Sequence, residues 1–308
     1  MRTEQQVLRV SLVAILAFSA LGIGFGLVSG SSAIIFDGVF SLIDAVVSVV
    51  MIVVVGLITR SASNQLSPQM RRRFTMGFWH FEPIVLATSA LLMMSVGAYA
   101  LVQSVLALLT GGREIEFGPA IVYAAIVLVL TTVVGLLEYR ANKKIGSAFV
   151  AIDIKGWMMS GGITSALLIA FGIGALIDGT QLDWLMPYVD PGVLALVAVV
   201  LIPVPLATLR KAVAEIALVT PPRLREEAEE VAAQMVTEQG FETFRCHVAQ
   251  VGRAKQVEII FHVPTGLGPR PLEDWDEIRT RIQRQLGQDD PNNWITVMFT
   301  TRPLADAT

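Results

Sequence analysis

Cysteine, histidine and charged residues are scarce in this chain of 308 residues. The single cysteine, Cys246, excludes an intrachain disulfide. Charged residues make up 16% of the sequence, against about 25% in an average soluble protein. The formal net charge of −3 and the scattered basic residues give no support to nucleic-acid binding. The sequence contains no nucleophile–base pair, phosphate loop or metalloprotease motif, so it does not favour an enzyme.

Apolar residues are abundant instead. They make up 54% of the chain, which has a mean hydropathy of +0.63. A helix that crosses a bilayer needs about 20 mostly apolar residues. Six runs meet this requirement: Leu8–Val28, Ala33–Ile58, Phe81–Leu109, Gly118–Glu138, Ala148–Ile177 and Pro191–Leu209. The first run is too long for the apolar core of a signal peptide. The sequence therefore predicts an α-helical membrane protein, with a six-transmembrane-helix bundle over residues 1–212.

The basic residues indicate how the bundle is oriented. The loops on one side hold Arg2, Arg9, Arg60, Arg71, Arg72, Arg73, Arg140, Lys143, Lys144, Arg210 and Lys211. The loops on the other side hold only Arg113. Short loops rich in Lys and Arg stay in the cytosol. We therefore expect a multi-pass protein of the bacterial inner (plasma) membrane with both termini in the cytosol.

Charges become dense after Pro221, which indicates a water-exposed domain over residues 213–308. Alternating or β-branched segments predict strands, and apolar residues spaced by three and four predict helices. In chain order the expected elements are Leu224–Gln239, Thr243–Val251, Gln256–Val263, Pro271–Leu286 and Trp294–Thr300. This order of helices and strands predicts a cytosolic αββαβ domain.

Two of the predicted spans carry polar side chains on one helical face. The second span has Asp37, Ser41, Asp44 and Ser48. The fifth span has Asp153, Trp157, Ser160 and Thr164. Both sets follow a spacing of four, three and four, which aligns side chains along a helix. Ionisable groups at membrane depth are costly, and they usually line an ion path.

Carboxylates and hydroxyls are hard oxygen ligands that suit Mg²⁺, Ca²⁺ or Mn²⁺. The candidate metal ligands are therefore Asp44, Asp153, Asp37, Ser41 and Ser160. No cofactor is expected beyond a divalent cation as the transported substrate. A purely structural reading is also open, in which each carboxylate is protonated or bonded to hydroxyls and to Lys155.

Three segments resemble the cation diffusion facilitator family. Phe36–Asp44 is similar to its second transmembrane helix, Gly77–Pro83 to the start of its third, and Asp190–Pro191 to the start of its sixth. The order of six spans and an αββαβ tail matches the family over nearly the whole chain.

The resemblance implies a homodimer that exchanges metal ions for protons. Its metal site would take two residues from the second helix and two from the fifth. These positions fall on Phe40 and Asp44, and on Asp153 and Trp157. One residue of ligand type therefore remains on each helix, and Asp37 lies where the family often has another acid.

Two functions follow from this pattern. The first is export of a divalent cation in exchange for protons. The second is a degenerate, non-transporting membrane sensor or scaffold that acts through its tail.

His247 and His262, on adjacent predicted strands, are either remnants of a tail metal site or ordinary strand residues. A glycine series on the first span, Gly22, Gly26 and Gly30, favours close helix contact within the chain or between two copies.

Overall fold

A computed structural model of the chain describes residues 4–63, 65–145, 148–287, 290 and 293–302. Within them, six helical segments are long and apolar enough to cross a membrane: Arg9–Ser29, Ser32–Ala62, Phe81–Leu109, Phe117–Lys144, Gly156–Leu176 and Asp183–Ile216. A three-stranded sheet with helices follows them in the chain. The predicted fold class, a six-helix membrane bundle with an αββαβ domain, is confirmed.

The chain divides into two compact units. The first comprises Met1–Val50 and Thr88–Thr208, and the second comprises Met51–Ala87 and Leu209–Thr308. Helices α2 (Ser32–Ala62), α4 (Phe81–Leu109) and α8 (Val204–Ile216) contribute residues to both. The expected division of the sequence into 1–212 and 213–308 stays a prediction.

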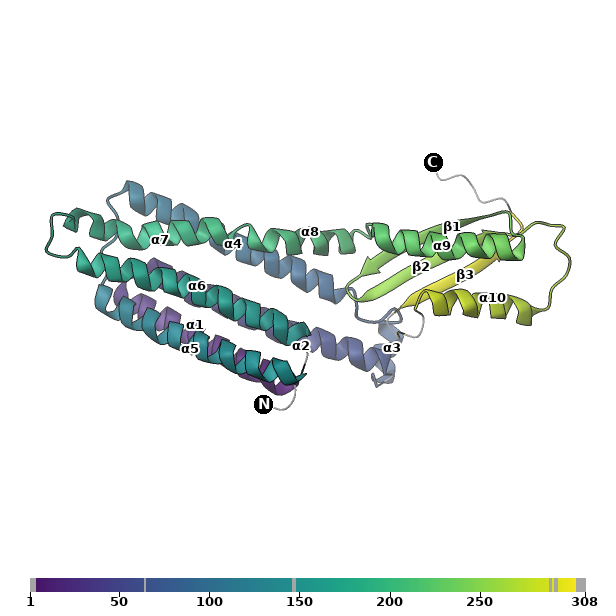
Figure 1. Cartoon of the computed structure of the whole chain (residues 1–308), viewed down its shortest axis with the longest axis horizontal. Helices are drawn as coiled ribbons and strands as arrows, with labels where there is room; N and C mark the ends of the chain where they lie inside the picture. The colour runs from purple at the N-terminus through teal and green to yellow at the C-terminus, as the bar shows by residue number, and fades with distance from the viewer. Residues whose placement is uncertain (1–3, 64, 146–147, 288–289, 291–292, 303–308) are drawn as a thin grey trace. The chain divides into compact units, whose positions relative to one another are not determined.

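In the first unit the helices pack as neighbours around an apolar interior. Helix α5 (Phe117–Ile145) contacts both α1 (Glu4–Ser29) and α6 (Ala148–Leu176), and the three helices run side by side in Figure 1. Helix α6 also contacts α7 (Met186–Leu201). The interior contains large, fully buried side chains: Tyr123, Leu167 and Phe171. The spacing of apolar residues over all faces of these helices is typical of membrane spans.

Two glycines of α1 allow close contact with α2. A Cβ atom on Gly22 would lie 2.7 Å from the Cα of Gly38, and one on Gly26 would lie 2.5 Å from the Ile35 side chain. Real side chains cannot occupy such positions without displacing the neighbour. Gly22 and Gly26 therefore serve packing within the chain, whereas a Cβ atom on Gly30 would meet only the Glu114 carbonyl at 3.6 Å, an ordinary contact.

The sixth span differs from its prediction. It is not one helix over Pro191–Leu209 but two, α7 and α8, with a short 3-10 turn, η1 (Asp183–Leu185), before them. The break falls at Ile202 and Pro203. Proline lacks the backbone N–H that would continue the helical hydrogen bonds, and Pro205 adds a second missing donor in the first turn of α8.

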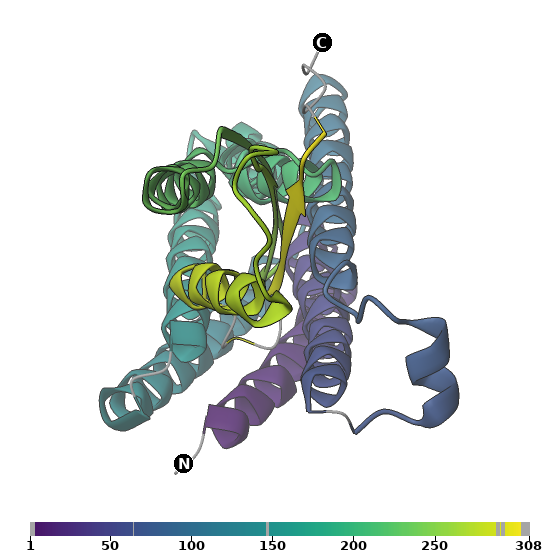
Figure 2. The ribbon, with the colours of Figure 1, turned by 90° about the vertical axis from the view of Figure 1, so that its right-hand side faces the viewer.

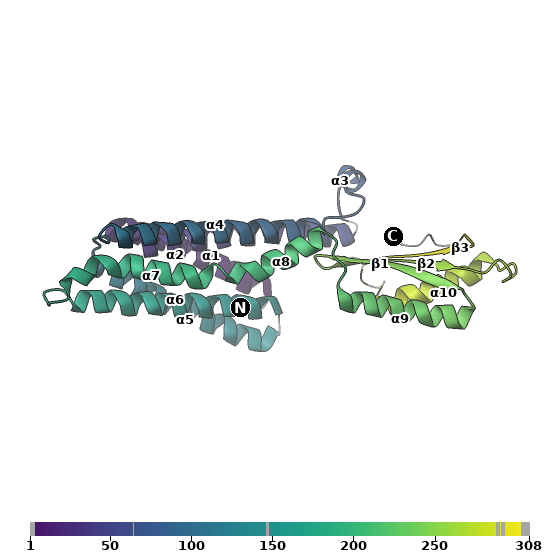
Figure 3. The ribbon, with the colours of Figure 1, turned by 90° about the horizontal axis from the view of Figure 1, so that it is seen from above.

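The second unit contains the αββαβ domain, made of α9 (Pro222–Gln239), β1 (Thr243–Val251), β2 (Ala254–His262), α10 (Leu272–Gln285) and β3 (Trp294–Thr300). The sheet order is β1-β2-β3, with β1 antiparallel and β3 parallel to β2. Both helices cover the same face of the sheet (Figures 2 and 3). Buried residues of both helices and all three strands form one core, which includes Met235, Phe261 and Ile282.

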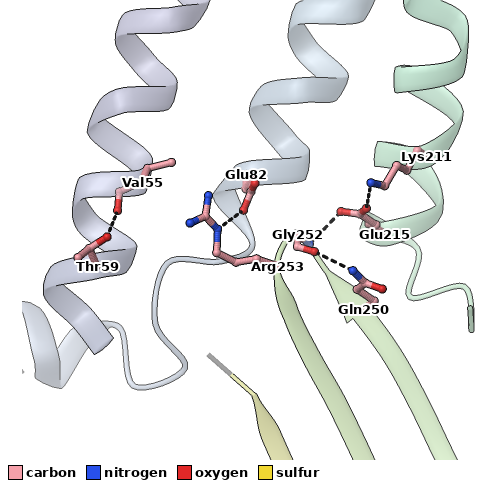
Figure 4. A network of polar contacts seen from close by, with 8 residues as sticks. All are labelled: Val55, Thr59, Glu82, Lys211, Glu215, Gln250, Gly252 and Arg253. Atoms are coloured by element: carbon pink, nitrogen blue, oxygen red, sulfur yellow. Dashed lines mark hydrogen bonds and ion pairs between the residues drawn. The ribbon is translucent and has the colours of Figure 1, made fainter. Parts of the chain in front are cut away.

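The tip of the β1–β2 hairpin is fixed to helix ends within the second unit (Figure 4). Gly252 has a φ of +58°, which the tight two-residue turn requires, and its N–H donates to Glu215 at 2.8 Å. Arg253 pairs with Glu82 at 3.2 Å, and Trp79 packs on Val251. The start of α4 and the end of α8 are thus held to the sheet.

The basic loop between the second and third spans contains a short helix that the sequence analysis missed. This helix, α3, covers Pro68–Arg73. The Ser67 side chain accepts a hydrogen bond from the Met70 N–H at 3.3 Å, and Pro68 stands in the first turn. Both are ordinary start signals for a helix, but the segment is too short to show periodicity.

Candidate functional site

The structure brings together the aspartates of the second and fifth spans. Asp44 lies on α2 and Asp153 on α6, both are half-buried, and they lie within electrostatic range of each other. They belong to the same compact unit. Two carboxylates from different helices can together neutralise the charge of a divalent cation bound between them.

The other predicted ligands lie further along the same helices. Asp37 stands seven residues before Asp44, which is about 10 Å along a helix axis. Its Oδ2 accepts a hydrogen bond from the Tyr123 hydroxyl at 2.8 Å. Ser41 is half-buried and lies between Asp37 and Asp44 along α2. Ser160 is half-buried two turns beyond Asp153, and its carbonyl accepts from the Thr164 hydroxyl at 2.9 Å. Among the predicted ligands, Asp44 and Asp153 are thus the pair from different helices that lies within electrostatic range of each other.

Aromatic side chains stand at the two positions where the family resemblance implies ligands. Phe40 packs on Phe36, with ring centroids 5.8 Å apart. Trp157 is 6% exposed and packs edge-on against Phe18 at 5.3 Å. Neither side chain can ligate a metal ion through its ring.

The Trp157 indole leads to a carboxyl group that the sequence analysis did not single out. Its N–H donates to Ser11 Oγ at 3.1 Å and to Glu138 Oε1 at 3.2 Å. The sequence predicts Glu138 as the last residue of the fourth span, at a membrane boundary. Helix α5 instead continues to Ile145, so Glu138 lies about 10 Å before its end. The sequence signal for Glu138 is that the helical segment continues beyond it to Ile145, which places this carboxylate inside the helix rather than at its end.

The described carboxylates do not form a ready-made metal cage. Among the residues that the structure covers, no group of three or more His, Cys, Asp or Glu side chains lies close enough to hold one metal ion. A cation at Asp44 and Asp153 would therefore need hydroxyl groups and water as further ligands. Partial hydration is common for hard divalent cations.

Asp190 of α7, another buried carboxylate, has a structural role. It is fully buried, and its oxygens accept from the Ser31 hydroxyl at 2.5 Å and from the N–H groups of Ser32 and Ala33 at 3.0 and 3.2 Å. The Ser31 hydroxyl also accepts from the Ile34 N–H at 3.2 Å. Asp190 and Ser31 together satisfy the first N–H groups of α2, which would otherwise be unpaired.

The tail histidines do not share a site. His247 on β1 pairs in register with Glu258, and His262 on β2 pairs with Thr243. The residue opposite His247 lies four positions before His262 on β2, so the two histidines stand about 13 Å apart along the strands. His262 Nδ1 lies 2.8 Å from Glu242. The histidines are thus placed as separate strand residues.

The tail cysteine is chemically quiet. Burial, and then the nearby charge of Glu229, raise the pKa of the Cys246 thiol to about 11. At neutral pH it is protonated, and a protonated thiol is a poor nucleophile and a poor metal ligand.

Six apolar helices with carboxylates buried between them are the construction of a membrane transport protein. The chain matches the cation efflux transmembrane domain over residues 8–217, and it belongs to the cation diffusion facilitator family. It is also 27% identical over 215 residues, 68% of each chain, to the manganese efflux system protein MneP of Bacillus subtilis (strain 168). Members of this family are transporters that export metal cations rather than enzymes. The expected class, an integral multi-pass cation transporter, is thereby confirmed.

Proposed function

We propose that the protein exports a divalent cation across the membrane in exchange for protons, through a site formed by Asp44 and Asp153. The observation that carries this proposal is the placement of the two aspartates, from α2 and α6, within electrostatic range of each other. Asp37, Ser41 and Ser160 continue the polar path along the same two helices. Alternating access of such a site to the two sides of the membrane moves the ion.

Mn²⁺ is the cation that the site suits best. Carboxylate, hydroxyl and water oxygens are hard ligands, which favour Mn²⁺, Mg²⁺ or Ca²⁺ over ions that prefer sulfur or imidazole. The similarity to a manganese efflux system protein points the same way. A carboxylate binds either a cation or a proton, so loading the metal releases protons and couples the two movements.

The orientation and assembly belong to the same proposal. Basic residues in alternate loops favour cytosolic termini in the plasma membrane of a bacterium. Export then runs from the side of the αββαβ domain to the opposite side. A homodimer is the assembly expected from the family.

A second candidate function is a membrane sensor or scaffold that has lost transport. The observation in its favour is the pair Phe40 and Trp157, whose aromatic rings stand at family ligand positions and take part in packing instead. Such a protein would bind metal through its tail domain and move none.

A transport assay separates the two candidates. The purified full chain is reconstituted in proteoliposomes that contain a pH-sensitive dye, and Mn²⁺, Mg²⁺, Ca²⁺, Zn²⁺ and Co²⁺ gradients are applied in turn. The expected result is a proton movement that depends on the Mn²⁺ gradient and is weaker with the other ions. No proton or metal movement with any ion, together with metal binding by the protein, would instead support the sensor.

A further inference from the structure

Glu138 is the most deeply buried acidic side chain near the proposed site, and the transport mechanism above does not use it. Its side chain has no exposed surface, although it lies on α5, outside the two helices that carry the polar stripes. A carboxyl group in such a place is costly unless it is paired or binds a ligand.

Its surroundings connect three helices. The Glu138 carboxyl is within hydrogen-bonding reach of Ser11 on α1 and of Asp153 on α6. The Trp157 N–H, from one turn further along α6, donates to Glu138 Oε1 at 3.2 Å. The indole N–H thus binds Oε1 of Glu138 and leaves Oε2 of the same carboxyl group without a bond to the indole.

The remaining oxygens lack partners. Among the described residues, Oε2 of Glu138 and Oδ2 of Asp153 are buried and make no hydrogen bond. More than about nine in ten buried polar groups in native proteins are satisfied, so each exception needs an explanation. Two neighbouring carboxyl groups with open oxygens are a usual arrangement for binding a hard cation.

We propose that Glu138, Asp153 and the Ser11 hydroxyl form a binding site for a hard divalent cation, in which Glu138 supplies the carboxylate that Trp157 cannot. This inference rests on the proposed function, because it adds a ligand from α5 to the site on α2 and α6. The set contains two acidic residues and one hydroxyl, and water completes the coordination. Asp44 lies within electrostatic range and adds a further negative charge.

The arrangement explains why an aromatic residue can stand at a ligand position. Trp157 cannot bind the metal ion itself, but its indole N–H holds Glu138 and Ser11 in place through hydrogen bonds. A purely structural acid at this place would have both oxygens satisfied by neighbouring donors, as those of Asp190 are. Glu138 differs from Asp190 in this respect.

Equilibrium binding of Mn²⁺ to the purified full chain tests the proposal. Free Mn²⁺ is measured by its electron paramagnetic resonance signal while the ion is titrated into protein in detergent micelles. Glu138→Gln keeps the size and the acceptor for Trp157 but removes the charge. It is expected to weaken binding at least tenfold. Glu116→Gln, at an exposed position just before α5, is the matched control and is expected to bind as the unchanged protein does.

Ser11→Ala is the second variant, in case Glu138→Gln does not give a monodisperse protein. It removes one ligand and no charge, and a threefold or larger loss of affinity is expected. Wild-type affinity in a folded Glu138→Gln or Ser11→Ala protein would overturn the proposal.

Because binding is measured without transport, the proposal that Glu138 is a ligand and the proposal that the protein transports a cation can fail separately. A wild type that transports Mn²⁺ with a Glu138→Gln variant of unchanged affinity rejects the α5 ligand alone. Binding that needs Glu138 in a protein that transports nothing rejects the transport function alone.

Discussion

Replacing Asp44 by alanine is expected to abolish metal-dependent proton movement in proteoliposomes. Asp44 is the carboxylate of α2 that lies within electrostatic range of Asp153 on α6. Asp44→Ala removes one of the two carboxylates that would pair with the bound cation. Losing one partner of a buried pair of opposite charges costs on the order of 3 kcal/mol, so binding of the cation should fall by about 100-fold or more. The measurement is the dye signal after a Mn²⁺ gradient is applied.

The matched control for Asp44→Ala is Asp178→Ala. Asp178 is exposed in the loop after α6, so its loss should leave the flux unchanged. Both variants must reconstitute to the same protein density, which excludes a difference in insertion. A proton flux in Asp44→Ala equal to that of the unchanged protein would reject the assigned role of this residue.

The second large effect is expected on stability, from Asp190→Ala. This change leaves the Ser31 hydroxyl and the N–H groups of Ser32 and Ala33 without their acceptor in a buried place. Each donor left unsatisfied in a buried place costs about 1 kcal/mol or more, so losing the acceptor of three donors should lower the free energy of unfolding by about 3 kcal/mol. Equilibrium unfolding in mixed detergent–SDS micelles, followed by circular dichroism, measures it.

Asp190→Asn serves as the comparison, because the amide oxygen can still accept from one or two of these donors. We expect its free energy of unfolding to lie between those of the alanine variant and the unchanged protein. If Asp190→Ala unfolds at the same SDS fraction as the unchanged protein, the carboxylate does not stabilise the start of α2.

Much of the fold could be predicted because local patterns determine it. Runs of about 20 apolar residues have few alternatives to a membrane helix. In the tail, β1 and β3 have the predicted bounds, Thr243–Val251 and Trp294–Thr300. The second strand begins at Ala254 rather than Gln256, because the hairpin turn needs only Gly252 and Arg253. The break between α7 and α8 was missed, although Pro203 was visible in the sequence.

The candidate site could be predicted only in part. The stripes on the second and fifth spans depend on helical periodicity, so Asp44 and Asp153 could be found from spacing alone. The bonds from Trp157 to Glu138 and Ser11 depend on how α1, α5 and α6 are rotated against each other. No pattern within one helix specifies that rotation, so the third carboxyl group emerged only from the packing.

The most direct test of the central claim is the water accessibility of position 44. In a background with Cys246→Ser, a cysteine is placed at position 44 (Asp44→Cys) or at position 46 (Val46→Cys). Two residues along a helix differ by about 200° around its axis, and Val46 is 55% exposed on the outside of the bundle, where lipid would cover it. A charged methanethiosulfonate reagent is applied to membranes, and the modified fraction is measured by mass spectrometry. We expect modification at position 44 and little at position 46. Modification at position 46 with none at position 44 would contradict a hydrated path between α2 and α6.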